Sequence, residues 1–303
     1  MSAEVKKPSN LLLRFAVGIP VGMVAVWFFA FGDLSLLFFV VAGAWVAIRE
    51  FWRLVGVEHK SARLPLSLFG EVFMVFFLYS VWSQRVWSQP TMPLDVLIIA
   101  GFIPILFMAQ LFARARGNPG FGHEVSSVTL GVLYIGGFLS FLFRLKHLEL
   151  QQLGAISFDS GIFHAPNMAH LTIFPVVGGW CCDTAAFFSG KYFGLTKLVP
   201  SISPGKTVMG LVGGMVGTAA GVTAYAGCIG MLDSVAMWKF IVFGLACGAL
   251  SQLGDLTMSA FKREVGVKDT GRILGAHGGM LDRIDGFLWS LPATYIFFLL
   301  VLR

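Results

Sequence analysis

One stretch near the C-terminal end, residues 259–286, combines charged side chains and glycines in a pattern that could do chemistry. Its ionisable side chains are Lys262, Arg263, Glu264, Lys268, Asp269, Arg272, His277, Asp282, Arg283 and Asp285. Cations that could hold phosphate therefore stand beside carboxylates that could hold a metal ion. The stretch also contains glycines that would let the backbone approach a ligand closely, at positions 266, 271, 275, 278 and 279.

Three of the aspartates in this stretch and its lead-in, Asp255, Asp282 and Asp285, could lie near one point. Asp255, Ser259 and Lys262 are spaced i, i+4 and i+7, which puts them on one helical face. Asp282 and Asp285 are three residues apart at the start of the last apolar run, so their carboxylates can converge. Such oxygen ligands suit a hard divalent cation like Mg²⁺. Carboxylates that hold a metal ion, together with nearby cations that neutralise phosphates, are typical of enzymes that catalyse phosphoryl or nucleotidyl transfer. The alternative is a salt-bridged cytoplasmic loop whose positive charges only reflect the positive-inside rule of membrane proteins.

Two further polar groups precede this stretch. Asp183 and Lys191 are eight residues apart and so lie near one helix face. A carboxylate inside an apolar span is costly unless it is paired, metal-bound or in a wet cavity, so Asp183 is either a site residue or a partner of Lys191. The second group is SPGKT, which begins at Ser203 and could present Lys206 and backbone N–H groups at a helix N-terminus. It is not the P-loop pattern, and Ser-Pro also simply begins helices.

The elements that must position these residues are apolar helices. The chain has 303 residues, of which 56% are hydrophobic and 13% charged, whereas soluble domains carry about a quarter charged residues. The composition predicts an all-α polytopic membrane protein without a basic soluble module for nucleic acid. Spans need about 20 apolar residues, and nine runs qualify. They are residues 11–31, 34–52, 66–83, 93–113, 126–144, 168–189, 207–230, 236–258 and 284–302.

The distribution of positive charge predicts the orientation. With the N-terminus in the cytoplasm, 17 of the 22 lysines and arginines fall on the cytoplasmic side, where such residues accumulate. The C-terminus is then non-cytoplasmic, and the charged stretch faces the cytoplasm. Residues 1–165 are interpreted as a transmembrane scaffold and 166–303 as the catalytic transmembrane region with its cytoplasmic loops. Glu71 lies inside a span, so it is either a functional acid or a residue near an interface.

The pattern S-x2-K-R-x4-K-D-x-G-x2-L-x2-H-G-G-x2-D-R-x-D, from Ser259 to Asp285, resembles the hallmark of the phosphatidate cytidylyltransferases, or CDP-diacylglycerol synthases. The lead-in Gly254-Asp255-Leu256, the SP-x-K-T element and Asp183-Thr184-Ala185 also resemble family features, in the family's order. The resemblance covers residues 175–300 well, and the first half only in being hydrophobic. Many members have Pro-Gly before His-Gly-Gly, where this chain has Gly275-Ala276.

The resemblance implies that CTP and phosphatidic acid react to CDP-diacylglycerol and pyrophosphate for phospholipid synthesis. It also implies a homodimer in the bacterial inner membrane that uses Mg²⁺ and a second cation such as K⁺. Carried onto this chain, the expected metal ligands are Asp183, Asp255, Asp282 and Asp285. The expected catalytic residues are Asp255, Lys262, Arg263, Lys268, His277, Asp282, Arg283 and Asp285. The expected cofactor-binding residues, around the nucleotide, are Ser203, Lys206, Ser259, Asp269, Gly278 and Gly279.

Three other functions compete with this interpretation. A related lipid cytidylyltransferase or lipid kinase with another acceptor would share the site, and the first half, which would touch the lipid tails, does not decide between them. An ion-coupled transporter could use Asp183, Glu71 and Asp255 as a cation path, but the two halves do not have matching interrupted spans. A CDP-alcohol phosphotransferase would need D-x2-D-G-x2-A-R, and no A-R follows Asp282 to Gly286.

Overall fold

The computed structural model describes residues 22–29, 31–57, 66–83, 121–152, 169–271 and 278–302, together with positions 98, 101–102, 104–108, 111, 115 and 273. In this part of the chain, six helices are long and apolar enough to cross a membrane, and a shorter apolar helix accompanies them. The chain is therefore a mostly helical, integral membrane protein. The expected runs 11–31 and 93–113 lie largely outside the described residues, so the total of nine spans stays a prediction.

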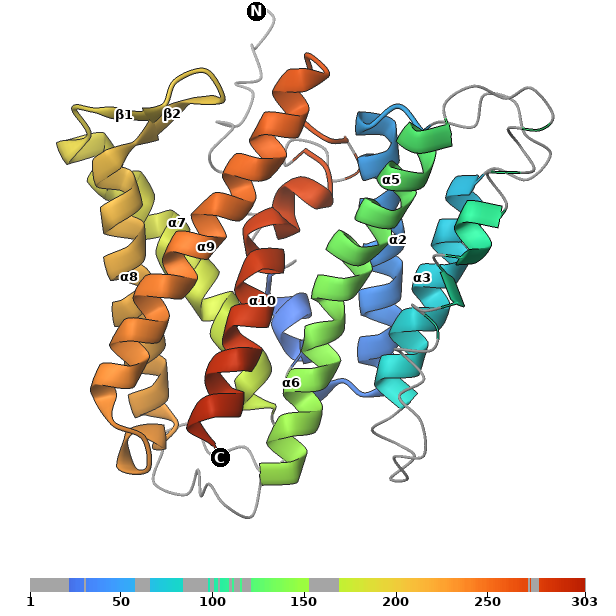
Figure 1. Ribbon diagram of the computed structural model, residues 1–303. Coiled ribbons are helices and arrows are strands. Elements are labelled where there is room, and N and C mark those ends of the chain that lie inside the picture. Colours follow the sequence, from blue (N-terminus) through green and yellow to red (C-terminus); the bar gives the residue numbers. More distant parts are fainter. Residues whose placement is uncertain are drawn as a thin grey trace, which may run out of the picture.

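The helices follow the apolar runs closely. They are α2 (Leu34–Leu54), α3 (Leu66–Ser83), α5 (Phe121–Gly131), η1 (Val132–Gly137), α6 (Phe138–Gln152), η2 (His170–Thr172), α7 (Phe174–Phe193), α8 (Val208–Cys228), η3 (Met231–Asp233), α9 (Met237–Glu264) and α10 (Leu281–Val301). The π-helical turn η1 joins α5 and α6 into one span, residues 122–149. Successive helices from α7 to α10 run in opposite directions (Figure 1), as short connections between spans require.

Two helix ends differ from the prediction. The helix α9 continues to Glu264, six residues beyond the predicted end at 258, because the charged segment after the apolar run keeps helical geometry. The helix α5 begins at Phe121, five residues before the predicted run at 126, and Glu124 lies in its first turn, where negative charge is favourable.

The prediction of an all-α chain missed one small sheet. Strands β1 (Lys197–Val199) and β2 (Ser203–Thr207) form an antiparallel hairpin between α7 and α8, with Lys197 opposite Thr207. SPGKT is therefore a strand and not itself a helix N-terminus. Its last residue, Thr207, is the N-cap of α8 and accepts a 3.0 Å hydrogen bond from the Gly210 amide.

Glycines on α8 allow this helix to pack closely against α7. A Cβ added at Gly217 would overlap the Ala185 side chain, and one at Gly221 would overlap Cys181. Small residues at this spacing let two helix backbones approach each other. The four cysteines are free, and Cys182 and Cys247 are buried, in keeping with a packing role.

Glu71 takes part in a pairing between two helices of the N-terminal half. The residue is 4% exposed, and its carboxylate accepts hydrogen bonds from Trp45 Nε1 at 2.6 Å and Arg49 Nε at 3.2 Å. Both donors lie on α2, so Glu71 fastens α3 to α2, and this contact accounts for an acid inside a span.

The bundle brings the predicted chemistry to one end. The hairpin, the last turns of α9, the start of α10 and the end of α2 all lie at the upper end of Figure 1, and α10 finishes at the opposite end. Since α10 packs against α9 and α7 on one side and α6 and α2 on the other, its start is placed by both halves of the chain.

Candidate catalytic site

The first group of charges, which we call the Asp255 cluster, consists of Asp183, Lys206, Asp255, Arg283 and Asp285. Lys206 Nζ lies 2.7 Å from Asp255 Oδ2 and 3.3 Å from the carbonyl oxygen of Gln252. The hairpin therefore places Lys206 against the polar face of α9. The Ser259 hydroxyl lies 3.4 Å from Asp255 Oδ1, which confirms that these residues share one face.

Asp183 and Asp285 complete this cluster from neighbouring helices. Asp183, an exposed side chain on α7, lies within electrostatic range of Asp255, Lys206 and Arg283. Asp285 is 7% exposed, accepts a 2.7 Å hydrogen bond from the Gly286 amide and experiences the like charge of Asp255. Asp255 on α9 thus experiences the like charges of Asp183 on α7 and Asp285 on α10, with Lys206 beside it, an arrangement that would attract a cationic ligand.

Lys191 is not the partner of Asp183. Its ammonium group lies over the rings of Phe187 and Tyr192, 6.0 Å and 5.6 Å from the ring centroids. Of the two interpretations of Asp183, the structure therefore favours its place in the Asp255 cluster.

The second group, which we call the Asp282 cluster, consists of Glu50, Lys262, Thr270, Gly279 and Asp282. Lys262 Nζ lies 2.7 Å from Asp282 Oδ1, and the two side chains are only 12% and 5% exposed. Asp282 Oδ2 accepts hydrogen bonds from the backbone amides of Thr270 at 2.8 Å and Gly279 at 3.1 Å. Both oxygens of Asp282 are engaged, so this carboxylate joins the end of α9 to the start of α10.

Other predicted residues lie around the two clusters. Arg263 donates to the carbonyl oxygens of Ile202 and Val267 at 3.1 Å and 3.4 Å, so it holds the hairpin turn against the end of α9. Lys268, Asp269 and Arg283 are exposed, Ser203 lies in β2, and Gly278 adopts a φ of 81°. His277 lies outside the described residues.

Two members of the Asp282 cluster, Glu50 and Thr270, were not predicted from the sequence. Glu50 is an acid inside an apolar run, which is the same signal that singled out Glu71. Thr270 gives no such signal, because a threonine in a polar loop is ordinary.

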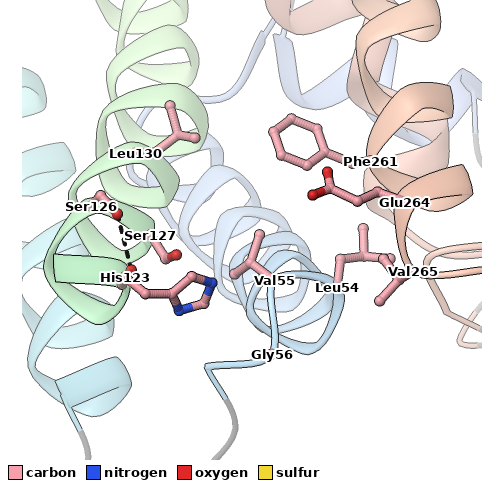
Figure 2. Close-up of a pocket in the computed structure, with 10 residues that line it drawn as sticks. All are labelled: Leu54, Val55, Gly56, His123, Ser126, Ser127, Leu130, Phe261, Glu264 and Val265. Carbon is pink, nitrogen blue, oxygen red and sulfur yellow. Dashed lines mark hydrogen bonds between the residues drawn. The ribbon is translucent and has the colours of Figure 1, made fainter. Parts of the chain in front are cut away.

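A hollow of about 390 Å³ lies beside the clusters, between the ends of α2 and α9 and the start of α5 (Figure 2). Apolar side chains such as Leu130 and Phe261 line it together with His123 and Glu264. No predicted site residue is among its lining residues. The hollow therefore neighbours the charged site but is not lined by the predicted catalytic residues.

The donor set of the two clusters fits a divalent cation that is shared with a substrate. Among the described residues, no three histidine, cysteine, aspartate or glutamate side chains stand close enough to hold a metal by themselves. Mg²⁺ in nucleotide enzymes is usually held by one or two carboxylates together with substrate phosphates and water. Asp255 and Asp285 fit that requirement, whereas Asp282 would first have to release Lys262. The identity of the metal ligands stays a prediction.

Comparison with known proteins gives one consistent family. A family model described as "Cytidylyltransferase family" matches residues 12–301. The phosphatidate cytidylyltransferase of Thermotoga maritima is 32% identical over 228 residues, which cover 73% of this chain and 74% of that protein. The phosphatidate cytidylyltransferases of Bacillus subtilis and Brucella suis are each 29% identical, and both alignments cover 95% of this chain and 97% and 93% of those proteins.

Proposed function

The chain belongs to the cytidylyltransferase family, and we propose that it transfers a cytidylyl group from CTP to phosphatidic acid, giving CDP-diacylglycerol and pyrophosphate. The relatives named phosphatidate cytidylyltransferase support this acceptor. The observation that carries the proposal is the convergence of Lys206, Asp255 and Lys262 with Asp282 at one end of the bundle. These residues come from a hairpin and two helices, and they have the charges that a triphosphate requires.

The reaction is an in-line displacement at the α-phosphorus of CTP. An oxygen of the phosphatidate monoester forms the new bond to phosphorus, the bond to the bridging α–β oxygen breaks, and pyrophosphate leaves with the electron pair. A phosphate monoester has a second pKa of about 6, so the nucleophile is already ionised near neutral pH. It therefore needs no general base, and catalysis consists mainly of positioning and charge stabilisation.

The role proposed for each charged residue depends on how exposed its side chain is. Lys206 and Asp255 have side chains that are 21% and 45% exposed, so a phosphate can reach the lysine and exchange for the carboxylate. Lys262 is enclosed with Asp282 and contributes a fixed positive charge beside the site. Arg283, exposed on the first turn of α10, is placed to contact a phosphate group of CTP or of the lipid.

Asp255 and Asp285, with Asp183 nearby, are the residues proposed to hold Mg²⁺. The ion, when bound, would neutralise charge that develops on the triphosphate. Asp282 as a further ligand, and a second cation such as K⁺, stay proposals of the same kind.

The membrane setting is part of the same proposal. We place the site at the cytoplasmic face of a bacterial inner membrane, where CTP is available, with the acyl chains of the acceptor remaining in the bilayer. A homodimer is proposed on the family resemblance.

The test is a transfer assay with the purified full-length protein in detergent. Labelled CTP, phosphatidic acid and Mg²⁺ are expected to give a lipid-linked cytidine product, and EDTA is expected to abolish it. Product formed only with another lipid phosphate would move the assignment to a different acceptor. A folded protein that forms no lipid-linked cytidine with any lipid phosphate would contradict the proposed reaction.

A further inference from the structure

Glu50 is a buried carboxylate on the last turns of α2, in the half of the chain interpreted as scaffold. We propose that Glu50 is a positioning residue for the catalytic site, which holds Thr270 and the start of α10 so that Asp282 stays directed at Lys262. The proposal rests on the proposed function only for its kinetic measurement. Its structural basis is a set of contacts that cross from α2 to the start of α10.

Among the described residues, the hydrogen bonds of Glu50 all go to the part of the chain that carries the site. The residue is 2% exposed. Oε1 accepts a 3.0 Å hydrogen bond from the Met280 amide, and Oε2 accepts one of 2.9 Å from the Leu281 amide. Oε2 also lies 2.9 Å from the Thr270 hydroxyl. One side chain from α2 thus caps the start of α10 and also binds Thr270, which precedes that helix in the chain.

Thr270 links Glu50 to Asp282. Its hydroxyl lies 2.9 Å from Glu50 Oε2 and 3.0 Å from Asp282 Oδ2. A hydroxyl has one proton to donate, so the two carboxylates compete for it while the Thr270 amide stays bonded to Asp282. A shift of Glu50 would therefore move Thr270 and, with it, the carboxylate that faces Lys262.

The glycines of the sequence pattern are explained by the same packing. A Cβ added at Gly271 or at Gly279 would overlap the Glu50 carboxylate, and at Gly279 it would also overlap the Thr270 hydroxyl. These two positions must lack a side chain because both lie directly against the Glu50 carboxylate. The sequence interpretation assigned this closeness to a ligand, whereas in the structure it is made to a side chain of the protein.

The negative charge of Glu50 has a specific partner in the start of α10. Backbone amides at a helix N-terminus carry partial positive charge and lack partners within the helix. Glu50 accepts hydrogen bonds from the amides of Met280 and Leu281, while Asp282 accepts one from the amide of Gly279. A neutral amide side chain would present N–H where an acceptor is needed, so Glu50→Gln perturbs this start without removing volume.

Glu71→Gln is the matched control. Glu71 is also a buried acid with two hydrogen-bond donors, but its partners Trp45 and Arg49 lie on α2 and not in the segment 270–281. If Glu50 only stabilised the fold, the two variants would behave alike. We expect Glu50→Gln to lower kcat about tenfold to a hundredfold, the usual effect of losing a partner that orients a site residue. Glu71→Gln is expected to keep kcat within about threefold, because its partners do not touch the segment that carries the site.

A double-mutant cycle tests the link through Thr270. Thr270→Val is expected to lower kcat in the same direction as Glu50→Gln, and Thr270→Ser, which keeps the hydroxyl, is expected to retain more activity. The losses of Glu50→Gln and Thr270→Val should be less than additive, because both break the same connection. If Glu50→Gln fails to fold, the valine and serine variants alone decide the question, since only the hydroxyl separates their expected rates.

Hydrogen exchange gives a result that does not depend on turnover. Amides in the segment 268–282 should exchange faster in Glu50→Gln than in the wild type and remain protected in Glu71→Gln. A wild type without transferase activity would contradict the proposed function while leaving this comparison intact. Equal kcat losses in the two glutamine variants, additive losses in the cycle, or unchanged exchange in Glu50→Gln would each overturn the positioning role.

Discussion

The Lys262–Asp282 pair shows how much depends on single charges at this site. Removing one partner of a buried pair leaves the other charge uncompensated, and this pair is nearly enclosed. Asp282→Asn is therefore expected to lower the transfer rate about a hundredfold or more, with little effect on membrane insertion, which the apolar spans decide. The rate is measured with labelled CTP, and insertion is measured as protein in the membrane fraction. Activity near the wild-type level would contradict both the positioning role and the metal-binding role of Asp282.

The salt bridge of Lys206 differs from the Lys262–Asp282 pair in its exposure. Its contact with Asp255 is partly exposed, and such pairs contribute about 0–1 kcal/mol to stability. Lys206→Ala should leave the thermal midpoint almost unchanged and raise the KM for CTP about tenfold or more, as expected from losing a charge-assisted phosphate contact of about 1.5–3 kcal/mol. Lys197→Ala is the control, because this exposed lysine lies on the other strand of the same hairpin. A KM that changes equally in both variants would argue against phosphate binding by Lys206.

At the residue scale, the sequence revealed charges but not the contacts that hold them. Asp255, Lys262 and Asp282 could be singled out because charged residues are rare in an apolar chain. Glu50 could not be connected to them, since its hydrogen bond to Thr270 joins residues 220 positions apart. No periodicity or local spacing reports a contact of that range.

At the element scale, the contact between α7 and α8 gives a prediction about packing. Gly217 faces Ala185 so closely that even a Cβ would overlap it. Gly217→Leu should push the helices apart and lower stability by about 1–3 kcal/mol, the usual cost of overpacking. Activity should fall too, because α7 carries Asp183. Thermal inactivation in detergent measures the change, with Val216→Leu at an exposed neighbouring position as control. Equal midpoints for the two variants would contradict this packing.

The elements themselves were predictable where hydrophobicity decides them. Seven of the expected runs coincide with described helices because a span must be apolar over its whole length. The hairpin was missed because two short strands of polar residues have no such signal. Its position depends on contacts with α9, through Lys206 to Asp255 and Arg263 to Ile202, which only the folded chain provides.

At the scale of the whole molecule, α10 connects the two halves. Phe287 stacks on Phe29 with ring centroids 5.6 Å apart, and Trp289 meets Phe138 edge to face at 6.2 Å. These contacts continue, deeper in the bundle, the connection that Glu50 makes at the end of the helix. The sequence pattern suggested that the first half of the chain resembles the family only in hydrophobicity, but the family model matches from residue 12 onwards. This half also packs directly against the helix that carries Asp282 and Asp285.

The direction in which the bundle crosses the membrane also stays a prediction, and it can be tested by labelling. The hairpin and the turn η3 lie at opposite ends of the bundle (Figure 1), and positive charge concentrates at the hairpin end. Because lysines and arginines are retained on the cytoplasmic side, the hairpin should face the cytoplasm. In a chain whose four cysteines are replaced by alanine, a membrane-impermeant maleimide should label Lys197→Cys only in inverted vesicles. It should label Ser234→Cys, at an exposed position after η3, only from the outside of spheroplasts. The reverse pattern would put the site on the side without CTP and would contradict both the orientation and the proposed donor.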